Sequence, residues 1–291
     1  MARTKTIANP PPPLVNYRES YSWASDRLLA ESSTLTSSED WKDHTKSEPI
    51  GKAFGKDDDA YISVRPCVPG EPVCVDNRSN NGEPFFFFYQ TVFKHVGQHL
   101  PFNRFERELL TELNVAPAQL HPNSWAFIRA FSLLMGYLGL SPSVDVFLHF
   151  FEAKSPGNNL WVSLSGVTGR VLFSLFQQSY KGFRGKFFRV CASDHDRRAL
   201  DGFPLYWVEE LKFSKAKTLD ELSLTSRETC QVLAILGMIF NTAEIIKHGR
   251  DPAALAKYLG MGFLHHLFIH MLCITFSCTF NYACFIFLVH L

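Results

Sequence analysis

The sequence predicts an α+β protein with about four helices first, then a small, mostly antiparallel sheet, then further helices. Three observations lead to this prediction. Apolar residues recur every three or four positions between residues 85 and 151, the period of one helix face. Between residues 160 and 208 they form short aromatic or β-branched runs separated by glycines, which are typical of strands. Helical periodicity returns after Thr225, so helices and strands do not alternate as they do in parallel α/β folds.

Composition and charge narrow the class of protein. The chain has 291 residues, and 29 Lys and Arg against 28 Asp and Glu give a formal net charge of +1, which argues against a uniformly basic nucleic-acid coat. Hydrophobic residues make up 46% of the chain, too many for a wholly disordered protein, and 27 Phe predict a Phe-rich core.

Seven cysteines occur without any C-x-x-C pair, and the first ten residues lack the apolar core of a signal peptide. We therefore expect an intracellular protein, nuclear or cytoplasmic, with reduced cysteines and with no metal site or cofactor.

Residues 1–84 are expected to form a largely disordered tail and linker. They contain a Pro10 to Pro13 run, a Ser/Thr-rich stretch and three successive aspartates at 57–59, with too little apolar surface to offset the entropy lost on ordering. One short docking segment around Trp23 and Leu28 stays open as an alternative. The breaker-rich residues 76–83 end abruptly at Phe85, where we place the start of a domain that should unfold cooperatively without the tail.

The helical part should begin with a Phe-rich helix over 85–96, for which a strand is the second interpretation. Residues 102–113 then show the pattern of an amphipathic helix whose Glu106 and Glu108 face water.

A stiff connector with prolines at 117 and 122 should separate this helix from the third, because proline fixes φ and cannot continue a helix. We expect Asn123 or Ser124 to cap the third helix and Gly139 to close it. The fourth should start at Ser141 with Pro142 in its first position.

Strands are expected next, followed by helices. The strand candidates are residues 160–165, 171–176, 187–191 and 204–208. A capping-box pattern at Thr225 to Glu228 precedes a helix that runs to about residue 239, and Asp251-Pro252 should begin another that ends near Tyr258.

The last segment, residues 263–291, contains no Asp, Glu, Lys or Arg. Its length and apolarity would suit a single membrane-spanning helix of a tail-anchored protein. Three histidines, several polar residues and the lack of a basic flank argue against a span. Because T-rich DNA encodes the residues that dominate this segment, we favour translation past a missed splice site and keep the membrane span as the alternative.

Six blocks carry a resemblance to a known family. They are residues 100–102, 116–127, 147–151, 161–164, 181–190 and 203–207, and the most distinctive element is the Q-L-H-P-N-S-W motif at 119–125. In this order they resemble the gypsy-type transposon family of plant genomes, whose members are often labelled transposases. The family positions that we interpret as structural are Gln119, His121, Pro122, Asn123, Trp125, Trp161, Phe187 and Trp207.

Composition and the resemblance together predict an organisation into a tail (1–84), the gypsy-type domain (85–210), a helical extension (211–262) and the charge-free segment (263–291). It implies origin more than chemistry: family members form the gag-like, N-terminal part of transposon-derived reading frames, and they offer no catalytic residues to carry over. We therefore interpret the chain as a non-enzymatic gag-like protein that associates with itself or with other transposon-derived proteins. The alternatives are a transposase fragment without its catalytic part and a tail-anchored protein with a membrane as partner.

A basic run is the one candidate for nucleic-acid contact. Its cations alternate with aromatic residues, the combination that single-strand binders use to meet phosphates and stack on bases. We prefer the interpretation that the aromatics are core and the cations form the wet face of a strand. The run consists of Lys181, Arg184, Lys186 and Arg189.

The histidines offer two further candidates. His95 and His99 lie four residues apart but lack the glutamate of H-E-x-x-H, so we expect a solvent-facing pair and not a metal site. For His121 we expect a hydrogen bond that fixes the connector, since no Ser or Cys nucleophile adjoins it as general-base chemistry would need. We assign no catalytic residues and no metal ligands.

Overall fold

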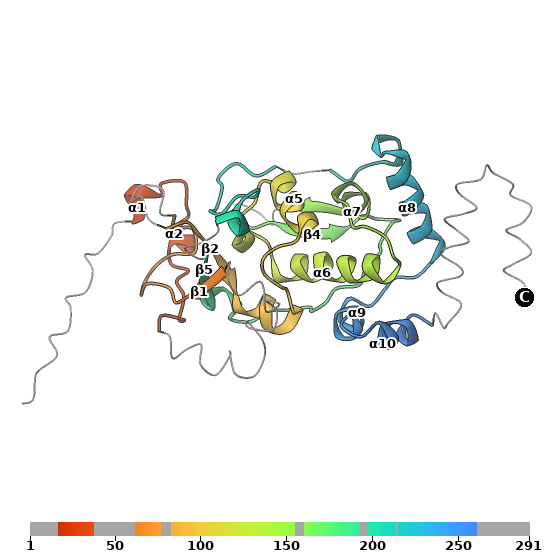
Figure 1. The fold of residues 1–291 in the computed structure, drawn as a ribbon. Coiled ribbons are helices and arrows are strands. Elements are labelled where there is room, and N and C mark those ends of the chain that lie inside the picture. Colours follow the sequence, from red (N-terminus) through yellow and green to blue (C-terminus); the bar gives the residue numbers. More distant parts are fainter. Residues whose placement is uncertain are drawn as a thin grey trace, which may run out of the picture.

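A three-stranded antiparallel sheet organises one end of the molecule (Figure 1). The computed structural model describes residues 17–37, 62–76, 83–154, 160–192, 197–212 and 215–260. Strand β5 (Phe187–Ala192) is central, with β1 (Ile62–Arg65) on one side and β2 (Phe85–Tyr89) on the other. Helices form the middle and the opposite end, so the α+β class is confirmed.

The prediction of a helix over residues 85–96 is wrong for the first half of that range. Phe85–Tyr89 is strand β2, and only a short π-helix, η2 (Val92–Val96), follows it. All five residues of β2 are buried. The two faces of the strand are both covered, because Phe88 meets Trp125 on one face (ring centroids 5.2 Å apart) and Tyr89 meets Trp161 on the other (5.6 Å). Strand alternation divides five successive aromatics between two packed faces.

Two segments of the predicted tail belong to the packed structure. Helices α1 (Tyr17–Ser20) and α2 (Asp26–Leu29) lie beside the sheet, and the backbone N–H of Thr34 donates to the carbonyl of Gly185 (2.9 Å). Leu28, Leu35, Ile62 and Val73 are buried in the same core as β2 and β5. The domain start at residue 85 is therefore corrected for residues 17–37 and 62–76, while the proline run and the aspartates at 57–59 lie outside the described residues.

Helix α5 (Arg104–Leu113) is confirmed with one correction, since Glu106 does not face water. The Glu106 side chain is buried, where its carboxylate accepts hydrogen bonds from the Gln98 side chain (2.8 Å) and the Asn103 backbone N–H (2.9 Å). The Asn103 side chain in turn accepts a hydrogen bond from the Glu106 backbone N–H, so the two residues form a capping box at the start of α5. Glu108 is exposed, as predicted, and pairs with Arg104 (2.6 Å).

The third and fourth predicted helices form as α6 (Pro122–Tyr137) and α7 (Val144–Phe150). Gly139 follows α6 with φ of +67°, as expected of a residue that ends a helix. Pro142 is not at the first position of α7, because the next residue, Ser143, is the N-cap. The Ser143 hydroxyl accepts a hydrogen bond from the backbone N–H of Val146 (3.3 Å). The chain then forms a two-stranded antiparallel sheet of β3 (Phe151–Lys154) and β4 (Ser163–Gly166).

The strand predictions hold in part. Residues 160–165 and 187–191 contribute to β4 and β5, but 171–176 makes only an isolated bridge, from Phe173 to Phe240. Residues 204–208 form no strand and run as an irregular segment with Trp207 buried. A strand there would need a neighbour, and this segment is held instead by the side chain of Gln119.

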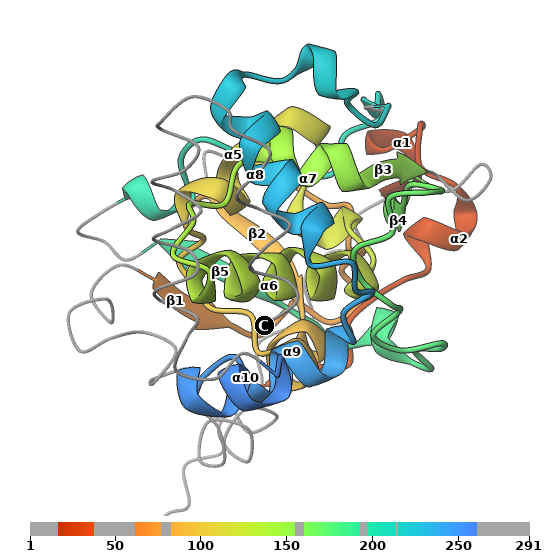
Figure 2. The same ribbon diagram turned by 90° about the vertical axis from the view of Figure 1, so that its right-hand side faces the viewer.

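The last described helices cover α6 and α7 (Figure 2). They are α8 (Leu224–Ile235), α9 (Thr242–His248) and α10 (Pro252–Tyr258), and short 3₁₀ turns occur at Pro117–Gln119, Phe183–Gly185, Arg197–Leu200 and Leu219–Glu221. Ser223 caps α8, so the predicted capping box at Thr225 is wrong and the helix ends four residues earlier than expected. Asp251 caps α10, with Pro252 first, as predicted.

Within the described part of the chain no helix has the length and apolarity needed to cross a membrane. The segment 263–291, on which the membrane alternative rests, lies outside the described residues.

Candidate functional site

The Q-L-H-P-N-S-W motif lies where three distant segments of the chain meet, and we call its residues 119–125 the joint. Gln119 is completely buried, and its side-chain amide makes four hydrogen bonds. The amide oxygen accepts from the backbone N–H of Ala116 (3.0 Å) and of Val208 (3.0 Å). The amide nitrogen donates to the carbonyls of Leu160 (3.3 Å) and Val208 (2.9 Å). These four bonds use the whole hydrogen-bonding capacity of the side chain.

His121 is the N-cap of α6, whereas Asn123 or Ser124 was expected to cap this helix. Its Nδ1 accepts a hydrogen bond from the backbone N–H of Asn123 (3.2 Å), and its ring packs edge-on against Tyr180 and Phe183. Burial, and secondarily the charge of Arg184, lowers the pKa of His121 to about 4. The imidazole is therefore neutral at physiological pH, which leaves Nδ1 free to accept the capping bond.

Asn123 and Ser124, displaced from the cap, bind neighbouring backbone instead. The Asn123 amide donates to the carbonyl of Gln177 (2.8 Å) and accepts from its N–H (3.1 Å). The buried hydroxyl of Ser124 accepts from Leu164 N–H at the start of β4 (2.9 Å). The polar side chains of the joint thus bind backbone around it, which is a structural role.

The aromatic family positions are core residues in the structure. Trp125 is fully buried, stacks on Phe102 at 5.0 Å, and donates its indole N–H to the carbonyl of Pro117 (3.1 Å). Trp161 and Trp207 meet edge to face at 5.1 Å, and Phe187 is buried in β5. Pro122, also buried, occupies the first position of α6, where its missing N–H costs nothing.

The two arginines of the basic run are paired with acids. Arg184 pairs with Glu31 (2.9 Å) and lies over the ring of Trp161, with its guanidinium carbon 4.9 Å from the ring centroid. Arg189 binds both carboxylate oxygens of Glu71, whose side chain is 3% exposed, and lies over Phe85. Both acids come from the N-terminal segments, where no periodic pattern in the sequence marks them as partners.

The two lysines of the run lie in a different environment. Lys181 and Lys186 are exposed, while Phe183 between them and Phe187 after them are buried. Burial, and then the neighbouring charge of Lys186, lowers the pKa of Lys94. Two of the four cations of the run are therefore paired with acids, and the Phe183 and Phe187 side chains lie in the core.

Residues 88–155 match the family model described as "Putative gypsy type transposon". This part of the chain is similar to the gypsy-type transposon family. The match runs from the end of β2 through β3 and includes the complete joint. No curated protein and no solved structure matches the chain.

The backbone between His95 and His99, both in the matched segment, keeps the two side chains apart. Gly97 ends η2 in a left-handed conformation, so His95 and His99 do not share one helix face. His95 is exposed, whereas His99 is partly buried beside Arg129 (Nε2 to Nη2, 3.4 Å). Burial and the nearby charges of Arg129 and Arg250 lower the pKa of His99 to about 4. Across the described ranges, no three His, Cys, Asp or Glu residues form a group that could hold a metal ion.

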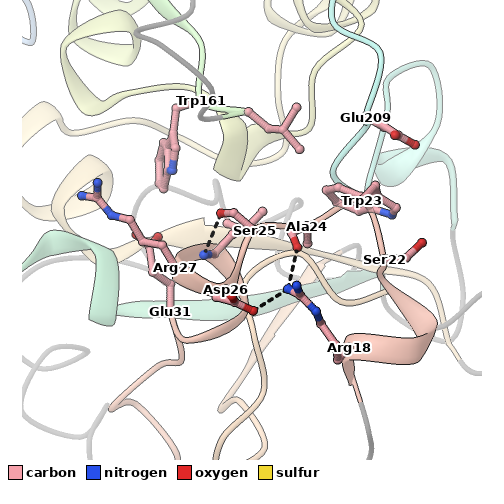
Figure 3. A pocket seen from close by; sticks show the side chains of 12 residues that line it. Arg18, Ser22, Trp23, Ala24, Ser25, Asp26, Arg27, Glu31, Trp161 and Glu209 are labelled. Atoms are coloured by element: carbon pink, nitrogen blue, oxygen red, sulfur yellow. Dashed lines mark hydrogen bonds and ion pairs between the residues drawn. The ribbon is translucent and has the colours of Figure 1, made fainter.

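A pocket of about 500 Å³ lies between the N-terminal segment and the residues Leu160, Trp161 and Glu209 (Figure 3). Trp161 points toward it from one side, and Trp23 and Glu209 lie on the other. Arg18 is held at its edge by Asp26 and by the carbonyl of Ala24 (3.5 Å). The lining contains charges of both signs and therefore selects no single class of charged ligand; its charged members are Arg18, Asp26, Arg27, Glu31 and Glu209.

Proposed function

We propose that this transposon-related protein is a non-enzymatic, gag-like component that acts by protein association. The observation that carries the proposal is the joint, because the most distinctive polar residues of the family segment all bind backbone. Gln119 has no hydrogen-bonding capacity left for a substrate, and the Nδ1 of His121 is used as a helix cap. A motif used in this way favours a scaffold over a catalytic centre.

Association is supported by apolar side chains that face solvent around α8. Leu224, at the first position of the helix, is 73% exposed, and Leu219 just before it is 41% exposed. Exposed apolar groups of this size are what an interface between proteins buries, and their burial supplies most of the association energy.

Self-association can be measured by sedimentation velocity of the full chain over a range of concentrations. We expect a concentration-dependent shift from monomer to larger species. Leu224→Glu should weaken it about tenfold or more, since burying a new unpaired charge is costly. Thr225→Glu is the matched control, because it adds the same charge at the next exposed position of α8. A monomer at every concentration, or metal-dependent DNA cleavage by the pure chain, would contradict the proposal.

Contact with single-stranded nucleic acid is proposed to be weak and without a dedicated platform. Stacking needs exposed rings, and the aromatics between the basic residues are buried. We expect replacement of Lys181 and Lys186 by Ala to change affinity for single-stranded RNA no more than replacement of Lys247 and Lys257, a pair of equal charge on α9 and α10. The measurement is the salt dependence of binding. A loss of about 1.4 in the log-log slope, specific to the first pair, would instead establish phosphate contacts there.

A further inference from the structure

An uncharged apolar surface lies where the end of α8 meets the segment 171–175. The bridge between Phe173 and Phe240 places these parts of the chain side by side, with Ser174 N–H donating to Phe240 O (3.0 Å) and Phe240 N–H to Leu172 O (2.9 Å). Around this bridge large apolar side chains are exposed, and we call them the α8 patch: Val171, Leu175, Ile235, Met238 and Ile239.

The α8 patch lies on two stretches of the sequence that carry no formal charge. Neither residues 171–180 nor residues 229–243 include an Asp, Glu, Lys or Arg. An occupant of the α8 patch would therefore bury apolar surface without stripping water from a charge, the step that makes burial of ionic groups costly. The best-matched occupant is itself apolar and free of charge.

The end of the described chain lies beside this surface. The Asn241 backbone N–H, two residues after Ile239, donates to the hydroxyl of Tyr258 (3.3 Å). Tyr258 is the last residue of α10, which packs against α9 below α6 (Figure 2). The polypeptide that follows Gly260 therefore starts close to the α8 patch, and each extended residue spans about 3.3 Å.

We propose that residues 263–291 of the same chain cover the α8 patch. This segment has no Asp, Glu, Lys or Arg, so it matches the patch in chemistry, and it is attached only a few residues from the patch. Covalent attachment makes docking intramolecular, and a short connection keeps the entropy of loop closure small. The inference concerns the α8 patch within one molecule and goes beyond the proposed function, whose surface at Leu224 lies at the other end of α8.

The natural cysteines allow a direct test in the full chain. Residues 263–291 contain Cys273, Cys278 and Cys284, whereas the cysteines of the described residues are buried. Burial raises the pKa of Cys67, Cys74 and Cys230 to about 12 and that of Cys191 to about 11, which suppresses their thiolates. Met238→Cys adds an exposed thiol to the α8 patch. Ser22→Cys is the control, because it adds an exposed thiol between α1 and α2, which lie at the opposite end of the molecule from α8 (Figure 1).

Under mild oxidation, Met238→Cys should form a disulfide with a cysteine of 263–291 inside the monomer at least about tenfold faster than Ser22→Cys does. Peptide mass spectrometry identifies the pair. Adding Ile239→Glu should slow the Met238→Cys reaction by about tenfold, because the new charge opposes apolar docking. Equal rates for the two cysteine variants would overturn the proposal, and so would a main product that joins residue 238 of two chains, which would make a second copy the occupant.

Discussion

A chain that begins at residue 85 is expected to lose cooperative unfolding. It lacks β1, which pairs with four residues of the central strand β5, and the buried side chains of Leu28 and Val73. Burial of each large apolar side chain contributes about 1.5 to 3 kcal/mol, so losing several of them approaches the entire stability of a typical domain, about 5 to 15 kcal/mol. The truncation also leaves Arg184 and Arg189 without the carboxylates of Glu31 and Glu71.

The measurement is thermal and urea unfolding of the 85–291 chain, followed by circular dichroism and tryptophan fluorescence. The full chain should give one cooperative transition, and the shortened chain a broad, sloping one with a reduced dependence on urea. A chain that ends at Gly260 is the control for truncation as such, because every helix and strand of the described residues remains. If the shortened chain unfolds as sharply as the full chain, the N-terminal segments do not contribute to cooperative unfolding, and the prediction is wrong.

Local signals account for the elements that the sequence predicted well. Helices α5 and α10 each begin at a residue whose side chain caps the backbone, and the proline of α10 follows its cap directly. Such signals act within one helical turn and need no knowledge of the fold. The prediction of a helix at β2 was wrong because apolar positions in a run of aromatic residues satisfy a helical period and a strand period equally well. The segment forms a strand because both of its faces pack against other residues.

The N-terminal segments could not be predicted, because their stability comes from partners far along the chain. Ser33 bonds to the backbone of Phe187, and Glu71 binds Arg189. A sequence pattern over a few residues contains no information about such a partner. The burial of Glu106 could not be predicted for a similar reason. Its neighbours on α5 indicate a solvent-facing position, whereas the hydrogen bond from the Gln98 side chain permits the carboxylate to be buried.

For the candidate site, sequence reasoning predicted structural roles for the family positions but not their partners. His121 was expected to fix the connector through a hydrogen bond, and it does so as the cap of α6. The contacts of Gln119 with Leu160 and Val208 span 41 and 89 residues, and nothing in the local pattern indicates them. The motif is visible in the sequence, whereas the segments that it joins are visible only in the fold.

Replacing Gln119 by Ala is expected to lower the free energy of unfolding by about 2 to 4 kcal/mol. The change removes an acceptor from two backbone N–H groups and a donor from two carbonyls, and alanine offers nothing in return. Leaving a buried backbone group without a partner costs about 1 to 3 kcal/mol, and the partly exposed Val208 recovers some of this from water. The effect should appear as a lower urea midpoint with an unchanged slope.

Urea unfolding of Gln119→Ala beside Gln231→Ala is the most direct test of a structural joint. Gln231 is exposed on α8, so its replacement removes the same side chain from the surface and should change stability by less than about 0.5 kcal/mol. We predict a loss of at least about 2 kcal/mol for Gln119→Ala alone. A Gln119→Ala protein as stable as the Gln231→Ala control would contradict the joint and return the motif to the candidates for a binding or catalytic role.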